Sequence, residues 1–436
     1  MDPLATGLVA LAALLGLIAA GVPVAIAMIL VACIGLWTTV GPTFMLTTVE
    51  TLPFALASDF TLVVIPMFIL MGALTAATGI TRELYEAAHR WTGGARGGLY
   101  YATTLASGAF GAINGSTVVS AALFTQIALP EMRKFGYSLP LSAGCICAAG
   151  TFAALIPPSV AMVLYALLVE ESVGAMLMAG LLPGALTVLV YLAGTWILVR
   201  VHAGAAPAER PRFGLQERLE SLKGVWATLV LALLVMGGIY SGTMFPSTAG
   251  AAGAAGALAI GLLRRRLTGR GFGGALREAV EMTAVLFAIL IGGLLLSRFL
   301  LISGVIGAVS GFATDSGLGA TGFLLVTIAI YLLLGAFIDG LSMLVMTVPL
   351  LHPVAVSLGL DPIWFGVIVI KLIEIGAITP PVGLNLFAVS AASRGLVETR
   401  ALYRGVLPFL LMELVTLLLL ILFPAITLWL PHSMQH

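Results

Sequence analysis

The sequence has little charge, few cysteines and few histidines, and each shortage excludes a class of protein. Charged residues make up 9% of the 436 positions, whereas hydrophobic residues make up 60%. A water-soluble core would need far more polar surface to cover it, so we expect a membrane protein with several spans. The net charge of +1 offers no basic face to nucleic acid.

The cysteines and histidines form no catalytic or metal-binding pattern. Cys33, Cys145 and Cys147 lie in apolar segments and are interpreted as buried thiols. Cys145 and Cys147 are too close for a usual zinc pair and have no histidine beside them. The five histidines are scattered, which argues against a membrane enzyme. The first residues, "MDPLATGLVA", lack the basic region of a signal peptide, so the first span is expected to be retained.

Long uncharged runs indicate helices that cross a membrane. No charged residue occurs within 135–169, 172–199 or 224–263. Each run holds at least one helix of about 20 residues, the length that crosses about 30 Å of hydrocarbon. The predicted fold is therefore an all-α polytopic membrane protein.

The chain is predicted to consist of two similar halves. Its most polar stretch lies within 203–224 and is interpreted as a cytoplasmic linker. The linker separates a first repeat, residues 1–202, from a second repeat, residues 225–436. Each repeat contains a long apolar run rich in glycine and serine, followed by a span that a Pro-Pro pair interrupts.

Each long apolar run is predicted to be a re-entrant helical hairpin. Residues 97–130 are flanked by basic residues on both sides, Arg96 and then Arg133. Basic flanks favour the cytoplasm, and a single helix of this length would be about 50 Å long. A hairpin with its tip in "GAINGSTVVS" explains both observations. Residues 321–357 predict a second hairpin with its tip near "GAFIDGLSML"; it has no basic flank and is expected to enter from outside.

Two adjacent prolines interrupt one span in each repeat. "AALIPPSVAM" lies within a span predicted at about 139–169, and "GAITPPVGLN" lies within one at about 362–393. Broken backbone is tolerated at membrane depth only where protein or a wet cavity surrounds it. Paired broken helices in two halves of opposite orientation are typical of secondary transporters with inverted repeats.

The spacing around the prolines supports a repeat. Pro130 precedes Pro157 by 27 positions, and Pro353 precedes Pro380 by the same 27. The matching positions of the two breaks are then Ala153 with Gly376, Ile156 with Thr379, and Ser159 with Val382.

An interrupted helix presents free N–H groups, which suit a carboxylate, and free carbonyl oxygens, which suit Na⁺. A hairpin tip that faces each break is predicted to complete a Na⁺ cage. The first predicted cage comprises Asn114, Gly115, Ser116, Ala153, Ile156 and Ser159. The second comprises Gly335, Asp339, Gly376, Thr379 and Val382.

Several polar residues in apolar runs allow more than one interpretation. Asp339 is costly in a membrane and either binds a ligand or hydrogen-bonds the hairpin backbone. Lys371 and Glu374 are one helical turn apart, and either neutralise each other or contact substrate. Arg298 reaches an interface, joins a subunit contact or binds substrate. Asn385 either holds the broken helix together or lines the cavity.

The chain resembles the large membrane subunit of tripartite ATP-independent periplasmic (TRAP) transporters, the DctM-like family. Four motifs carry the resemblance, which runs over essentially the whole chain: "GAINGSTVVSAALFTQIALPEMRKFGY", "GTFAALIPPSVAMVLYALL", "MAGLLPG" and "EIGAITPPVGLNLF". The resemblance implies a Na⁺-driven importer of organic acids that uses an elevator motion, in the inner membrane of a bacterium or archaeon. It also implies two Na⁺ sites at the tip and break positions.

The same resemblance implies where the substrate binds and which partners act with the chain. The substrate is expected between the tips, in contact with Asn114, Ser116, Asp339 and Asn385. The implied partners are a soluble periplasmic binding protein and a small four-helix membrane subunit, expected on a separate chain. The alternatives are a stand-alone Na⁺/dicarboxylate carrier of related fold, a channel and a membrane enzyme.

Overall fold

The computed structural model describes residues 2–202, 204–207, 213–315, 317 and 319–433. These residues form α-helices and short 3₁₀ turns, and none of them forms a strand. The predicted all-α class is confirmed.

Within the described residues, seven helical segments are long and apolar enough to cross a membrane, as a polytopic protein requires. These segments are Phe60–Ala77, Val173–Val201, Leu215–Tyr240, Pro246–Leu263, Gly269–Ile302, Gly340–Ser357 and Thr399–Leu422.

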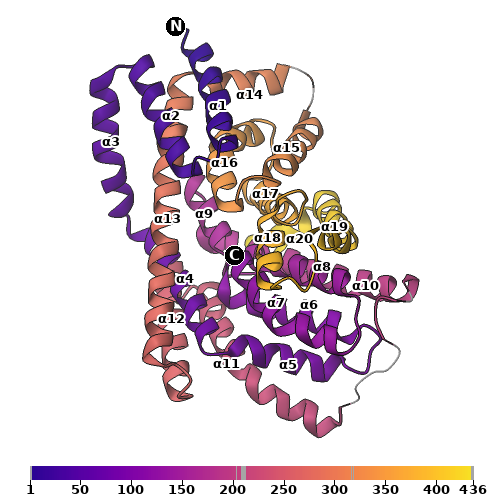
Figure 1. The fold of residues 1–436 in the computed structure, drawn as a ribbon. Coiled ribbons are helices and arrows are strands. Elements are labelled where there is room, and N and C mark those ends of the chain that lie inside the picture. Colours follow the sequence, from indigo (N-terminus) through magenta and orange to yellow (C-terminus); the bar gives the residue numbers. More distant parts are fainter. Residues whose placement is uncertain (1, 203, 208–212, 316, 318, 434–436) are drawn as a thin grey trace.

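Helices from the beginning and the middle of the chain pack into a first bundle, in which α13 runs alongside α2 and α4, and α12 packs on α4 (Figure 1). A Cβ atom on Gly253 of α12 would overlap the Met71 sulfur of α4, so the small residues of α12 let the two backbones approach closely. The first bundle comprises α1 (Pro3–Ala19), α2 (Val24–Thr39), α3 (Pro42–Ala57), η1 (Phe60–Val63), α4 (Val64–Ala77), α11 (Leu215–Tyr240), α12 (Pro246–Leu263) and α13 (Gly269–Ile302).

Most remaining helices form a second bundle, in which helices from both halves of the chain interleave. There α19 packs on α8, α18 packs on α7, and α17 packs on α10. Its members are α6 (Gly98–Asn114), α7 (Thr117–Lys134), α8 (Leu139–Ala149), η2 (Gly150–Ala154), α9 (Val160–Leu168), α10 (Val173–Val201), α15 (Gly319–Gly335), α16 (Gly340–Ser357), α17 (Pro362–Ala377), α18 (Leu384–Ala392), α19 (Thr399–Leu422) and α20 (Ala425–Ser433).

Two helices connect the bundles. The amphipathic helix α5 (Ile80–Thr92) packs against α6 of the second bundle and α11 of the first. Helix α14 (Val305–Asp315) follows α13 and packs against α16. The chain also passes between the bundles from α10 to α11, and the bundles pack directly on each other where α13 contacts α16 and α4 contacts α6.

Two segment boundaries differ from the prediction. Helix α11 begins at Leu215, inside the predicted linker, because the Glu217 carboxylate accepts a bond from the Gly214 N–H at 2.7 Å and caps the helix there. Residues 203 and 208–212 of that linker lie outside the described residues. Helix α7 continues through Pro130 to Lys134, since neighbouring helices in a membrane bundle tolerate the hydrogen bond that a proline removes.

Candidate functional site

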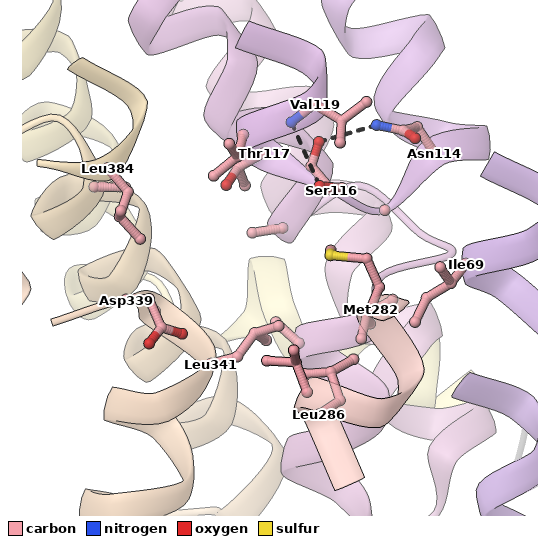
Figure 2. A pocket seen from close by; sticks show the side chains of 18 of the residues that line it. Ile69, Asn114, Ser116, Thr117, Val119, Met282, Leu286, Asp339, Leu341 and Leu384 are labelled. Carbon is pink, nitrogen blue, oxygen red and sulfur yellow. Dashed lines mark hydrogen bonds between the residues drawn. The ribbon is translucent and has the colours of Figure 1, made fainter. Parts of the chain in front are cut away.

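The turn between α6 and α7 lies at Gly115 and Ser116, and we call it the first tip (Figure 2). Ser116 caps α7, because its Oγ accepts from the Val119 N–H at 3.5 Å. The Asn114 side-chain amide donates to the Ser116 carbonyl at 3.0 Å and to Ser120 Oγ at 3.1 Å. These bonds use only the nitrogen of the Asn114 side-chain amide, so they leave its side-chain oxygen available to bind a cation.

The turn between α15 and α16, residues 336–339, is the second tip. Asp339 caps α16, and its Oδ1 accepts from the Ser342 N–H at 2.9 Å. Figure 2 shows the Asp339 carboxylate close to Leu341, at the edge of the pocket that both residues line. A carboxylate at this position both fixes the turn and presents its second oxygen as an acceptor.

Each predicted broken helix is interrupted next to its Pro-Pro pair. In the first break, the chain leaves η2 at Ala154 and resumes a helix at Val160, where Ser159 caps α9 by accepting from the Met162 N–H at 3.2 Å. In the second break, α17 ends at Ala377 and α18 begins at Leu384. Both Pro-Pro peptide bonds are cis.

Thr379 in the second break is partly engaged in the fold. Its hydroxyl donates to the Ile375 carbonyl at 2.6 Å, and its N–H donates to the Gly376 carbonyl at 3.1 Å. The proton of this hydroxyl is therefore used within the fold, whereas its oxygen lone pairs are not used by these bonds. Lone pairs are the part of a hydroxyl that a cation uses.

The helix that precedes each tip meets the break of its own repeat through backbone atoms at a glycine. A Cβ on Gly111 of α6 would lie 3.1 Å from the Ala153 N and Cα atoms. The second pair is closer still, because a Cβ on Gly335 would lie 2.6 Å from the Gly376 Cα. The structure thus brings Gly335 and Gly376 together, and places Ala153 beside the hairpin that carries Asn114.

A cavity of about 300 Å³ lies between the two tips (Figure 2). Its wall combines both tips with residues of the first bundle, among them Ile69 of α4 and Met282 and Leu286 of α13. Four helices begin at this cavity, so their unpaired N–H groups and positive dipole ends face it. The four helix starts line it at Thr117 (α7), Val160 (α9), Gly340 (α16) and Leu384 (α18).

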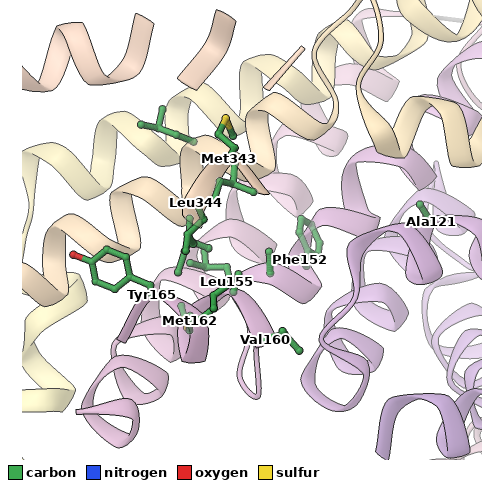
Figure 3. Packing of buried hydrophobic residues seen from close by; sticks show 14 of the residues in the cluster. Ala121, Phe152, Leu155, Val160, Met162, Tyr165, Met343 and Leu344 are labelled. Carbon is green, nitrogen blue, oxygen red and sulfur yellow. The ribbon is translucent and has the colours of Figure 1, made fainter. Parts of the chain in front are cut away.

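The cavity is backed by the buried core of the second bundle (Figure 3). Met343 and Leu344 of α16 belong to the same core as Leu155 at the first break and Tyr165 of α9. The Tyr165 hydroxyl donates to the Pro362 carbonyl at 2.7 Å, which fastens α9 to the start of α17. The two breaks are therefore held in one packed unit.

The polar lining of the cavity is acidic. Glu278 of α13, Asp339 and Glu374 of α17 line it, and among its described lining residues there is no lysine, arginine or histidine. Glu278 was not singled out from the sequence; the available signal was its place, with Glu281, just before the long apolar run that begins at Met282.

The predicted site residues divide into three sets. Asn114, Gly115, Ser116 and Asp339 line the cavity. The break residues lie one or two positions from residues that line it, namely Ala154, Val160, Ala377 and Leu384. These break residues are Ala153, Ile156, Ser159, Gly376, Thr379 and Val382, and Gly335 likewise is not a lining residue. Asn385 is not a lining residue, as described next.

Asn385 is fully buried and bridges the two repeats. Its amide nitrogen donates to the Cys147 carbonyl of α8 at 3.3 Å, and its Oδ1 has no hydrogen-bond partner among the described residues. Of the two interpretations of Asn385, the contacts match the one in which it holds the broken helix in place. Arg298 lies outside the cavity lining, where its guanidinium is 5.6 Å from the centre of the Phe44 ring.

Lys371 and Glu374 pair, as one interpretation of their spacing predicts, but a third charged residue joins them. Lys371 Nζ lies 2.8 Å from Glu374 Oε2 and forms a second ion pair with Glu413 of α19. The Tyr191 hydroxyl of α10 donates to Glu413 Oε1 at 2.6 Å. We call Lys371, Glu374 and Glu413 the buried triad. The sequence analysis missed Glu413, although it is a lone acid within "LMELVTLLLL".

Comparisons with known proteins support the family resemblance that the sequence motifs indicated. Residues 11–426 match the family model described as tripartite ATP-independent periplasmic transporter, DctM component. The chain is 36% identical over 381 residues to the C4-dicarboxylate TRAP transporter large permease protein DctM of Pseudomonas aeruginosa, covering 87% of this chain and 88% of that protein. It is 32% identical to the sialic acid TRAP transporter large permease protein SiaM of Vibrio cholerae, covering 96% of each.

A relative of lower sequence identity and a solved structure are also similar to the chain. The chain is 29% identical to the ectoine/5-hydroxyectoine TRAP transporter large permease protein UehC of Ruegeria pomeroyi, covering 85% of each. Its fold resembles that of the Alcanivorax borkumensis YdaH transporter, with a TM-score of 0.61 at 12% identity over 88% of this chain and 90% of that one. From the family match and the identities to the large permeases, we conclude that the chain belongs to the DctM component family of tripartite ATP-independent periplasmic transporters.

Proposed function

We propose that this large permease subunit imports a carboxylate-bearing solute together with Na⁺, and that both bind at the cavity between the two tips. The observation that carries the proposal is the convergence of four helix N-termini on one cavity. Unpaired N–H groups and positive dipole ends at such a point favour an anion. The same convergence of half-helices on a central site is typical of secondary transporters.

The charges of the lining favour cotransport with a cation. Glu278, Asp339 and Glu374 line the cavity, and its described lining contains no basic side chain. A carboxylate that entered alone would meet these acids without a counter-charge. Bound Na⁺ supplies that counter-charge, so the solute and the ion stabilise each other in the site, which is the thermodynamic basis of coupling.

The tips and breaks have the chemistry that Na⁺ requires. Na⁺ is held by carbonyl and hydroxyl oxygens at unwound helix segments. The second repeat offers these at Gly376 and Thr379, against the bare backbone of Gly335. The first repeat offers the side-chain oxygen of Asn114 and the backbone of Gly115 and Ser116, beside Ala153, Ile156 and Ser159.

The arrangement of the bundles supports an elevator motion. Both tips and both breaks belong to the second bundle, whereas Ile69, Met282 and Leu286 of the cavity wall belong to the first. The cavity therefore lies on the boundary between the bundles. If the second bundle slid along the first, it would carry the site across the membrane while the tips and breaks stayed together.

The solute class follows from the relatives. Their printed substrates include C4-dicarboxylates, sialic acid and ectoine, which carry a carboxylate, and isethionate, which carries a sulfonate, so an acidic anionic group is common to these compounds. As a member of a tripartite family of the inner membrane, the chain acts with a small membrane subunit and a periplasmic binding protein. We propose that the binding protein delivers the solute to the cavity.

Uptake by proteoliposomes tests the proposal. The subunit is reconstituted with its small membrane partner, and uptake of a labelled solute is measured with and without a Na⁺ gradient and the solute-loaded binding protein. The proposal predicts uptake only when both are present. Equal uptake without the binding protein would favour a stand-alone carrier. Equal uptake without a Na⁺ gradient would exclude Na⁺ as the coupling ion.

A further inference from the structure

The charged residues of the cavity wall are divided between the two bundles. Among the described lining residues these are Asp339 of the second tip and Glu374 of α17, both in the second bundle, and Glu278 of α13 in the first. In the proposed elevator motion, Asp339 and Glu374 travel with the bound solute and repel it equally in every position. Glu278 stays behind, so its charge meets the solute only in some positions of the second bundle.

The Glu278 carboxylate has no counter-charge in the described structure. None of the ion pairs among the described residues includes it. Arg277 is adjacent in sequence, but its guanidinium pairs with Glu281 at 2.7 Å. The Glu278 side chain is only partly buried, so it stays within reach of water and keeps its charge at neutral pH. The first bundle therefore presents an unpaired negative charge to the cavity.

Glu278 lies toward the cytoplasmic end of α13. The turn that precedes this helix carries Arg264, Arg265 and Arg266, and basic residues favour the cytoplasmic side. Glu278 is the tenth residue of α13 (278 − 269 + 1), about 14 Å along the axis from the first. The lining ends at Ile289, which leaves 13 residues of the helix beyond the cavity (302 − 289). The cavity therefore occupies the cytoplasmic part of the first bundle.

One face of α13 forms this stationary wall. Residues of the lining recur along the helix at spacings of three and four, which places them on a single face: Glu278, Met282, Val285 and Ile289. Figure 2 shows Met282 directed into the pocket. Glu278 comes first from the cytoplasmic end, and the other three are apolar.

The same face of α13 is uncharged beyond the cavity. Continuing the spacing from Ile289 gives Gly293, Leu296 and Leu300. This part of the face packs against the second bundle, because a Cβ on Gly293 would overlap the Val345 side chain of α16. A cavity moved toward the outer side would therefore face only uncharged residues on this face of α13.

We propose that Glu278 promotes solute release: its charge lowers the affinity of the cavity for an anionic solute when the second bundle is at the cytoplasmic side. Two like charges about 10 Å apart, at an effective dielectric constant of about 40, change a dissociation constant about four-fold. The repulsion is absent at the outer side, so the solute leaves more readily to the cytoplasm. The same charge attracts Na⁺, so the solute leaves before the ion. This inference rests on the proposed function, since it concerns release from the same cavity.

Rebinding of solute from inside tests the proposal. Proteoliposomes with the subunit and its small membrane partner are filled with unlabelled solute at fixed internal Na⁺, and the initial uptake of labelled solute from its binding protein is measured. The probe is whichever of succinate, sialic acid and isethionate the wild type takes up. Internal solute inhibits by occupying the cavity at the cytoplasmic side. The two readouts are the internal concentration that halves the rate and the external concentration of loaded binding protein that gives half the maximal rate.

Three variants separate charge from size. Glu278→Gln keeps the size of the side chain and removes its charge, whereas Glu278→Asp keeps the charge. Glu50→Gln is the control, because Glu50 is an exposed acid of the first bundle that lies outside the described cavity lining and outside the described ion pairs. Each protein is first checked for its thermal unfolding midpoint.

The expected change is confined to the internal side. Glu278→Gln should lower the half-inhibiting internal concentration about four-fold for each negative charge of the solute, and should leave the external half-saturating concentration unchanged. Glu278→Asp and Glu50→Gln should keep both wild-type values.

The wild-type protein supplies a second measurement that needs no variant. Raising the internal ionic strength with choline chloride from about 0.01 M to about 0.3 M shortens the screening length from about 30 Å to about 6 Å. Repulsion by Glu278 is then screened, so the half-inhibiting internal concentration of wild type should fall toward that of Glu278→Gln.

Several results would overturn the proposal. One is a half-inhibiting internal concentration that wild type and Glu278→Gln share, and another is a higher value in the variant, as expected for a residue that binds the solute. Glu278→Asp behaving like Glu278→Gln, or a wild-type value that ignores ionic strength, would also overturn it. None of these outcomes affects the proposed function, which fails separately if wild type shows no uptake that depends on Na⁺ and the binding protein.

Discussion

Gly376 gives the sharpest test of the tip-and-break arrangement, because its contact is made by backbone alone. A Cβ added at Gly376 would lie 2.8 Å from the Gly335 Cα, whereas ordinary van der Waals contact begins at 3.4 Å. In Gly376→Ala the second tip must therefore retreat by about 0.6 Å, the difference between these distances. No rotamer change relieves the overlap, since the atom that is struck belongs to the main chain.

The expected size of the effect follows from overpacking. Forcing an extra methyl group into a close contact costs about 1–3 kcal/mol. If the Na⁺-bound arrangement carries this whole cost, the Na⁺ concentration for half-maximal uptake rises about 5- to 150-fold. The first repeat has a looser contact, because a Cβ on Gly111 would lie 3.1 Å from Ala153 and so requires a retreat of about 0.3 Å. Gly111→Ala is therefore expected to have the smaller effect.

The measurement compares the Na⁺ dependence of uptake with the Na⁺-dependent rise in thermal unfolding temperature of the purified protein. The second readout needs no solute and no binding protein. Gly273→Ala on α13 is the control, since a Cβ there meets no atom within 4 Å. If Gly376→Ala keeps the Na⁺ midpoint of this control in both readouts, the second tip and the second break do not form one ion site.

Two further predictions concern the second ion site and the first hairpin. Thr379→Val keeps the shape of the side chain but removes its hydroxyl oxygen; a loss of about 1 kcal/mol should raise the Na⁺ midpoint about five-fold. Val382→Ala should have a smaller effect because the Val382 side chain has no oxygen and can offer Na⁺ only its backbone carbonyl, and equal curves for the two variants would reject the assignment. Cysteines introduced at Arg96 and Lys134 should react with an impermeant thiol reagent from the same face of the membrane, and labelling from opposite faces would exclude the first hairpin.

The fold class was predictable because its signals are local in the sequence. Long uncharged runs predict membrane helices without any knowledge of their neighbours, and the all-α class was confirmed. The Pro-Pro pairs likewise indicate interruptions, and the helices stop at Ala377 and resume at Leu384 around the second pair. The start of α11 was missed because the Glu217 cap makes a polar segment helical before the apolar run begins.

The parts of the site that were missed depend on contacts between distant segments. Glu413 lies 39 positions beyond Glu374 (413 − 374), and no spacing rule for a single helix relates it to Lys371. Glu278 reaches the cavity only because α13 of the first bundle packs beside the tips of the second. The sequence left two interpretations of Asn385 open, and its bond to Cys147 of α8 could not be foreseen because the two residues are far apart in the chain. Packing of whole helices decided each of these positions.

Coupled movement of Na⁺ and solute through one cavity is the central claim, and tracer Na⁺ entry driven by the solute tests it most directly. Proteoliposomes with equal Na⁺ on both sides receive an inward gradient of the solute through its loaded binding protein, and labelled Na⁺ inside is counted. The account predicts Na⁺ accumulation that requires the loaded binding protein and is weakened in Gly376→Ala. Solute entry with no accompanying Na⁺ would contradict it.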